Sequence, residues 1–248
     1  MEKVKLLPTN EDSQYYQQHI AGRHGKGSTT IGSKLLEDVS DKFMLNLLKE
    51  TDKAYQTAID EKGTPGRMVF AMETDRPIGT NAVYPIENLD KSTVFSAVRE
   101  PGTENEAKIR VALISEKDMP KTNVAQVIMG HYGPTGNAGI YTMIFGDEGM
   151  PFAESVAKRS PDDTEFIAKC QKYWDSHVFL ITPKELEANI EQMKAHGRPT
   201  KTQELALAAF RRRGEKSPIV QPYTPEISPN AVKMQMSCSR GVKPREYE

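Results

Sequence analysis

The chain has 248 residues, enough to bury a sizeable hydrophobic core as one large domain or two small ones. Its 33 lysines and arginines balance 34 aspartates and glutamates, so the net charge excludes a strongly basic protein, and any nucleic-acid surface has to be a local patch. The two cysteines, Cys170 and Cys238, lie far apart, which excludes a disulfide framework or a zinc motif and suits a reducing compartment.

No apolar run approaches the roughly 18 residues that a membrane-spanning helix needs. The first residues, MEKVKLLPTNEDSQYYQQ, lack the apolar region of a cleavable signal peptide. We therefore expect no membrane partner, and a protein that is cytoplasmic or exported by a specialised secretion system.

The N-terminal third is expected to contain a polar leader and then a helix. Residues 1–18 are polar, and a glycine-rich segment, HIAGRHGKGS, follows over His19–Ser28. Over residues 31–59 apolar side chains recur every three or four positions, which is typical of an amphipathic helix. Ser40 and Asp41 could cap or interrupt this helix.

From Arg67 to Gly146 the pattern changes to short β-branched and aromatic runs separated by turn residues. No helix-length pattern separates these runs, so we expect a mostly antiparallel sheet. The runs are MVFAM, NAVYPI, TVFSAV, KIRVALI, VAQVIMG and IYTMIFG, with HVFLI further along. The fifth and sixth runs flank Gly133, Pro134, Gly136 and Asn137, which predicts a β-hairpin.

Regular alternation along the second hairpin strand would place Ile140, Thr142 and Ile144 on one face. Tyr141, Met143 and Phe145 would then lie on the other face. A threonine between two isoleucines is either a sheet hydroxyl bonded to a neighbour or part of the floor of a site.

The C-terminal part is expected to be helical and then extended. Helical patterns lie between Pro151 and Asp175 and over residues 183–216, where His196 is expected to be exposed and remote from the sheet. Residues 217–248 contain five prolines and few large apolar side chains, which predicts an extended or poorly ordered tail. The predicted fold is α+β: N-terminal helices packed on a mostly antiparallel β-sheet over residues 19–182, with a C-terminal helical extension over 183–216.

His19 and His24 are the first candidates for chemistry, because Arg23 and Lys26 lie beside them. Two imidazoles can act as base and acid in one proton-transfer cycle, and the cations can stabilise charge on a phosphate. A surface loop with two incidental histidines is the alternative interpretation. Metal binding is a weaker one, because no carboxylate or cysteine accompanies the pair. The segment is not a phosphate-binding P-loop, since Lys26 is followed by Gly27 instead of Ser or Thr.

His177 and His131 are also open to two interpretations. His177 follows Tyr173 and Trp174 at the start of an apolar strand, and His131 lies at the end of the predicted hairpin. Each could be a structural residue or part of a site. The run Arg211–Arg213 suits a solvated helix end or a nucleic-acid patch. No dinucleotide, nucleophile-elbow or paired-metal motif is present in the sequence, so we expect no cofactor and no metal.

Several short motifs resemble the toxin domains of the barnase–EndoU–colicin–RelE-like ribonuclease group. The resemblance covers roughly residues 17–180. It rests on the segment from His19 to His24, Arg-Glu-Pro-Gly at Arg99, Met-Pro-Lys-Thr at Met119, the Ile-Tyr-Thr strand at Ile140, and Tyr-Trp-Asp-Ser-His-Val at Tyr173. The spacing between the histidine segment and the sheet is longer than in the compact members of that group.

The resemblance implies a metal-independent endoribonuclease of toxin or effector type. A base would take the ribose 2′-hydroxyl proton, the 2′-oxygen would attack phosphorus, and an acid would protonate the leaving 5′-oxygen. The implied catalytic residues are His19, His24, Arg23, Tyr141, Thr142 and His177. Lys26, Arg110 and His131 are the implied substrate-binding residues.

The expected partners are an RNA substrate and an inhibitory protein of immunity type. The alternative function, from a different class, is a non-catalytic protein-binding module that acts through its sheet edge or its C-terminal helices.

Overall fold

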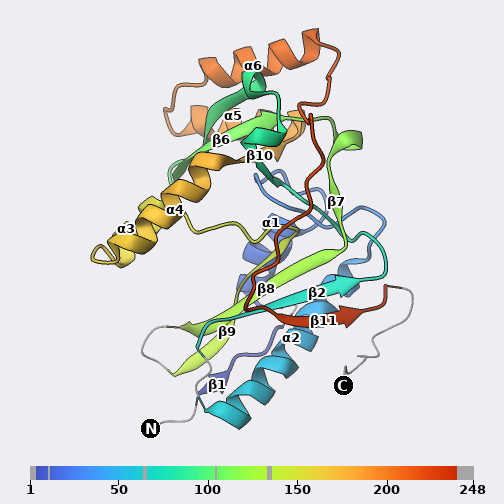
Figure 1. Ribbon diagram of the computed structural model, residues 1–248, viewed down its shortest axis with the longest axis vertical. Coiled ribbons are helices and arrows are strands. Elements are labelled where there is room, and N and C mark those ends of the chain that lie inside the picture. Colours follow the sequence, from blue (N-terminus) through green and yellow to red (C-terminus); the bar gives the residue numbers. More distant parts are fainter. Residues whose placement is uncertain (1–3, 11, 64–65, 104, 133–135, 239–248) are drawn as a thin grey trace.

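Two mixed β-sheets organise the described part of the chain, and they lie one above the other in Figure 1. The computed structural model describes residues 4–10, 12–63, 66–103, 105–132 and 136–238. The first sheet contains, in spatial order, β1 (Lys5–Leu6), β9 (Asn137–Phe145), β8 (Val124–Tyr132), β2 (Met68–Thr74) and β11 (Val232–Met236). The second contains β4 (Val83–Pro85), β10 (His177–Ile181), β6 (Ala107–Leu113) and β5 (Val94–Arg99). A small ribbon pairs β3 (Gly79–Thr80) with β7 (Lys121–Thr122).

The α+β class is confirmed, although the predicted strands divide between sheets. β8 pairs antiparallel with both β2 and β9, as expected for a hairpin-rich sheet. Parallel pairs join β1 to β9, β2 to β11 and β6 to β10. These parallel pairs involve strands separated by long stretches of chain, which runs of apolar residues alone do not identify.

The helix α2 (Asp41–Lys62) packs its apolar stripe on the first sheet. It begins later than the expected helix over residues 31–59, because the Ser40 hydroxyl accepts a hydrogen bond from the Phe43 amide and caps it. Residues 31–39 form an irregular segment instead, in which Leu35 bridges to Gly79. Leu47, Leu48 and Tyr55 of α2 are completely buried in the core of this sheet.

A β-bulge at Tyr141 changes the predicted alternation of β9. Ile128 pairs with Thr142, but the next residue, Met129, pairs with Ile140, so Tyr141 is the extra residue. Ile140 therefore shares the core face with Met143 and Phe145. Thr142 precedes Met143 and points to the opposite face of the sheet.

Two pairs of helices accompany the second sheet. The helices α5 (Pro183–Ala195) and α6 (Lys201–Arg212) bury Leu186, Ile190, Leu207 and Phe210 in the core of this sheet. The predicted helical extension is thus a layer of the fold. The helices α3 (Ala153–Arg159) and α4 (Thr164–Ser176) form a second pair at the side of the molecule in Figure 1. The short helices are a π-helix (Tyr16–Ala21), α1 (Gly22–His24) and three 3-10 turns (Ile86–Asn88, Lys91–Thr93 and Glu116–Asp118).

The C-terminal tail is extended, as predicted, but residues 217–238 are held in place by specific contacts. Ile219 bridges to Leu89, and β11 pairs with β2 over five residues. Between these contacts the Tyr223 hydroxyl donates to the buried carboxylate of Asp147. Backbone pairing with β2 and the buried contact with Asp147 attach this part of the tail, which has few large apolar side chains. Residues 239–248 lie outside the described part of the chain.

The polar leader predicted over residues 1–18 is likewise attached to the fold where it is described. β1 pairs with β9, and the Thr9 amide donates to the Asp52 carboxylate at 2.6 Å. Val4 and Leu6 pack against the core of the first sheet.

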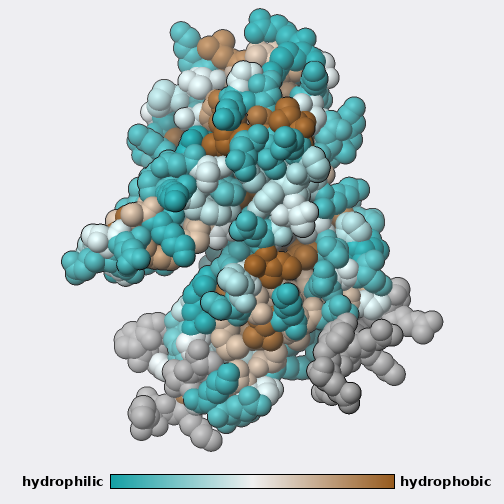
Figure 2. Space-filling model, viewed as in Figure 1, coloured by the Kyte–Doolittle hydropathy of each residue, from teal (hydrophilic) through white to brown (hydrophobic). Residues whose placement is uncertain are grey.

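The surface carries little contiguous apolar area on the face in view. Figure 2 shows hydrophobic residues as small separate groups among hydrophilic ones. None of the helices in the described ranges is both long and apolar enough to cross a membrane.

Candidate functional site

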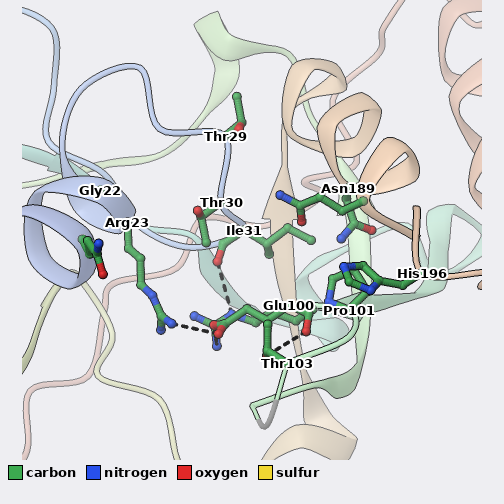
Figure 3. A pocket seen from close by; sticks show the side chains of 13 residues that line it. Gly22, Arg23, Thr29, Thr30, Ile31, Glu100, Pro101, Thr103, Asn189 and His196 are labelled. Atoms are coloured by element: carbon green, nitrogen blue, oxygen red, sulfur yellow. Dashed lines mark hydrogen bonds and ion pairs between the residues drawn. The ribbon is translucent and has the colours of Figure 1, made fainter. Parts of the chain in front are cut away.

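A polar pocket of about 360 Å³ lies where the histidine segment meets the second sheet and α5. Residues from three distant parts of the sequence line it: Gly22, Arg23 and Thr29–Ile31 from the N-terminal segment, Arg99–Pro101 and Thr103 from the end of β5, and Asn189, Gln192 and His196 from α5. Gln18 completes the wall. Figure 3 shows Arg23 on one side of the pocket and Asn189 and His196 on the other.

Two arginines of the pocket share one carboxylate. Arg23 Nη2 lies 2.8 Å from Glu100 Oε2, and Arg99 Nη1 lies 2.8 Å from Glu100 Oε1. Arg99 is fixed further by a bond from its Nε to the Ile31 carbonyl and by the Phe152 ring, 5.6 Å from its guanidinium carbon. Two cations and one anion leave this wall of the pocket with a net positive charge, which favours an anionic ligand.

The turn after β5, which positions Glu100 in the pocket, contains two residues with positive φ angles. Glu100 has φ = 50°, in the left-handed region that non-glycine residues rarely adopt, and Gly102 follows with φ = 78°. A Cβ on Gly102 would lie 2.2 Å from Nδ1 of His196, so only glycine allows the imidazole to rest against the turn. The Thr103 hydroxyl donates to the Glu100 carbonyl at 2.9 Å and holds the turn closed.

His19 does not line the pocket, but it follows the lining residue Gln18 and is close enough to Arg23 and Arg99 to be affected by their charges. Burial and the nearby cations Arg23 and Arg99 lower the pKa of His19 to about 4. The Tyr15 ring stacks on its imidazole, with ring centroids 4.8 Å apart. His19 Nε2 is buried and has no hydrogen-bond partner among the described residues.

His24 has a structural position. Its ring is 7% exposed, and its Nδ1 donates to the Ser33 carbonyl at 2.8 Å. Burial lowers its pKa to about 3, with a smaller opposing effect from the Ser33 bond and further lowering by Arg99. His24 therefore holds the loop over residues 24–33 closed instead of facing the pocket.

The stretch of residues 15–33, which contains His19 and His24, contacts the first sheet at strand β9. The Tyr15 hydroxyl donates to the Tyr141 carbonyl, and the Ser33 hydroxyl accepts from the Phe145 amide at 2.9 Å. His19 and His24 thus lie on a segment docked at both ends on this strand.

The two β9 candidates are not part of the pocket lining. The Tyr141 hydroxyl donates to the His131 carbonyl, and its ring lies against Gly130. Thr142 is on the opposite face of the sheet from the core, and no hydrogen bond between described residues joins it to His19 or His24. Tyr15 connects β9 to His19, because its hydroxyl bonds to the Tyr141 carbonyl and its ring stacks on the His19 imidazole.

His177 and Arg110 lie together at the end of α4, away from the pocket lining. The His177 ring stacks on Tyr173 at 3.9 Å, and its Nδ1 donates to the Tyr173 carbonyl. Arg110 donates to the Trp174 carbonyl at 2.7 Å and forms an ion pair with Asp175. Both side chains complete the C-terminal end of a helix.

The remaining candidates are also separate from the pocket lining. Lys26 lies half-buried in the loop after α1. His131 pairs with Ala138 near the hairpin end, and its Nε2 is buried without a hydrogen-bond partner in the described chain. The hairpin-loop residues Gly133, Pro134 and Thr135 lie outside the described part of the chain.

Among the described residues, Arg23 is the only one of the pocket lining that was predicted as a site residue; the charged and hydrogen-bonding residues Arg99, Glu100, Asn189 and His196 were not. His196 is exposed as predicted, but it is not remote, because α5 ends where the turn after β5 begins. The one usable signal was Arg-Glu-Pro-Gly directly after a strand, since charged side chains followed by Pro-Gly mark a tight turn at a strand end. Within the described ranges, no three His, Cys, Asp or Glu side chains are grouped so that they could hold a metal ion.

Comparisons of the chain with protein-family models, with curated proteins and with solved structures found no match.

Proposed function

We propose that this chain is a metal-independent endoribonuclease whose scissile phosphodiester binds in the Arg23–Arg99 pocket. The observation that carries the proposal is that one pocket brings Arg23 of the histidine segment together with Arg99 and His196; His19 follows the lining residue Gln18 but does not line the pocket itself. The guanidinium pair supplies the positive charge that a phosphoryl-transfer site needs at the phosphate oxygens. Glu100 keeps the two guanidinium groups in place before the substrate arrives.

His19 is the proposed base. With a pKa of about 4 its imidazole is neutral near pH 7, so it can accept the proton of the ribose 2′-hydroxyl. A bound phosphodiester adds negative charge beside the arginines, and this raises the pKa of His19 toward the range in which it can hold that proton. Nε2 is the proposed acceptor atom: it has no hydrogen-bond partner among the described residues, and because it is buried, substrate binding has to uncover it.

His196 is the proposed acid. It lies across the pocket from Arg23, and its exposure lets it exchange protons with water between turnovers. The 2′-oxygen attacks phosphorus, the bond to the 5′-oxygen breaks, and the His196 proton passes to that oxygen. The products are a 2′,3′-cyclic phosphate and a free 5′-hydroxyl, so atoms and charge balance.

The test is cleavage of an RNA oligonucleotide in EDTA, with product ends identified by mass spectrometry. We expect cyclic phosphate ends, and a rate about a hundred-fold lower for His19→Ala and for His196→Ala, the usual effect of removing a general base or acid. Arg23→Ala should lower the rate similarly, whereas Arg76→Ala should not, because Arg76 forms an exposed ion pair with Asp38.

Absence of cleavage with every RNA tested would overturn the proposal, provided that the purified protein carries no inhibitory partner. The non-catalytic protein-binding module would then be the better account of the chain.

A further inference from the structure

Asn189 presents a buried acceptor atom that nothing in the described chain satisfies. The residue is 3% exposed, and its Nδ2 donates to the Val98 carbonyl at 2.8 Å. Its Oδ1 is buried and has no hydrogen-bond partner among the described residues. An unsatisfied buried amide oxygen is costly, and Asn189 is one of the residues that line the pocket, so a pocket ligand that uncovers Oδ1 on binding can supply the missing donor.

The bond to Val98 also decides which way the amide points. A carbonyl can only accept, so the Asn189 nitrogen must face Val98 and the oxygen must be the free end. A flipped amide would set two oxygens against each other. Oδ1 is buried in the free protein, so a ligand has to displace the atoms that cover it and then donate an N–H or O–H to it.

The opposite side of the pocket calls for an anion. Arg23 lies there and shares the Glu100 carboxylate with Arg99, while Asn189 and His196 lie across from Arg23 in Figure 3. A volume of about 360 Å³ is in the lower range of small-molecule sites. A matching ligand is small, carries a negative group at one end and a hydrogen-bond donor at the other.

We propose that the pocket binds a nucleotide whose base carries an exocyclic amino group, with its phosphate at Arg23 and Arg99 and its amino group donating to Asn189 Oδ1. The assignment of a nucleotide rests on the proposed function. Asn189 is then the specificity-determining residue of the site.

Cytidine and uridine provide a nearly isosteric pair to test this. Cytidine has an amino donor at position 4, and uridine has a carbonyl acceptor at the same position. An acceptor placed against Asn189 Oδ1 leaves both oxygens unsatisfied, so we expect 3′-CMP to bind at least about ten-fold more tightly than 3′-UMP.

The experiment is isothermal titration calorimetry of the full chain with 3′-CMP, 3′-UMP and inorganic phosphate. Asn189→Ala should weaken 3′-CMP binding about ten-fold, to the level of 3′-UMP, and leave phosphate binding unchanged. Gln203→Ala is the matched control, because Gln203 is 5% exposed and donates in the same way to Ser96 of β5, but does not line the pocket. This variant should keep the full preference for 3′-CMP.

Equal affinity of the wild type for 3′-CMP and 3′-UMP would overturn the inference, as would a preference that survives in Asn189→Ala. The wild-type comparison needs no variant, so it stands even where Asn189→Ala fails to fold. Selective binding of 3′-CMP without RNA cleavage would refute the proposed ribonuclease activity and support base selection by Asn189. Cleavage without a base preference would support the ribonuclease activity and refute base selection by Asn189.

Discussion

Arg23 and Glu100 are 77 positions apart in the sequence, yet the guanidinium Nη2 of Arg23 lies 2.8 Å from the carboxylate Oε2 of Glu100. This contact joins the histidine segment to the turn after β5. Arg99 holds the other oxygen of the same carboxylate, so Glu100 separates two cations that would otherwise repel each other. The pocket is organised around this shared anion.

Glu100→Gln should therefore lower the free energy of unfolding by about 2–3 kcal/mol, because a largely buried pair loses its charge while the shape is kept. Urea denaturation measures the change. Asp38→Asn is the control, since it breaks an ion pair with Arg76 in which both side chains are well exposed, and it should change stability by less than about 1 kcal/mol. Equal effects of the two substitutions would show that Glu100 is not a structural centre.

The buried His24 should make the protein sensitive to acid. Its pKa falls from 6.5 to about 3 on folding, so between these values the unfolded chain binds one more proton than the native chain. Stability is then lost as the pH falls from about 6.5 toward 3, and above this window His24 contributes no pH dependence. His24→Gln should reduce the slope of unfolding free energy against pH by about 1.4 kcal/mol per pH unit in this window.

Urea titrations at pH 4, 5, 6 and 7 measure that slope. Asp52, whose pKa is raised by burial, acts in the opposite direction, but it is the same in both proteins and cancels in the comparison. Identical slopes for the wild type and His24→Gln would contradict the assignment of His24 as a neutral buried residue.

The tail should contribute measurably to stability through Tyr223. Its hydroxyl donates to the Asp147 carboxylate, which is 4% exposed, and hydrogen bonds to buried charges are stronger than neutral ones. We expect Tyr223→Phe to lower the free energy of unfolding by about 2 kcal/mol. Tyr84→Phe removes a hydroxyl that donates to the neutral Gln221 carbonyl at the same tail, and should cost about 1 kcal/mol. Thermal unfolding compares the two variants, and no loss for Tyr223→Phe would show that the tail is not anchored there.

The elements that depend on local pattern could be predicted from the sequence, and those that depend on long-range pairing could not. The β8–β9 hairpin and the α+β class follow from β-branched runs and turn residues. The bulge at Tyr141 could not be predicted, because one extra residue in a strand leaves no mark in the sequence and reverses which side chains face the core. The attachment of the tail depends on β2 accepting a parallel neighbour from 158 or more positions away.

The candidate site was predictable in part for a similar reason. Histidines beside arginine carry a chemical signal, so His19 and Arg23 could be found. Asn189 and His196 are ordinary helix and loop residues whose importance comes only from lying opposite the turn after β5. His24 carries the same signal as His19, and only its burial distinguishes the two.

The central claim, attack by a ribose 2′-hydroxyl in the Arg23–Arg99 pocket, is tested most directly with a DNA oligonucleotide that contains a single ribocytidine. In the presence of EDTA the wild-type protein should cut this strand once, directly 3′ of the ribocytidine, and leave a 2′,3′-cyclic phosphate. The same strand with a 2′-O-methyl group should remain intact, because the attacking oxygen has lost its proton. Cutting of the methylated strand or of an all-DNA strand would contradict the account. So would an intact ribocytidine strand in EDTA, if RNA of the same sequence is cleaved only when a divalent metal ion is added.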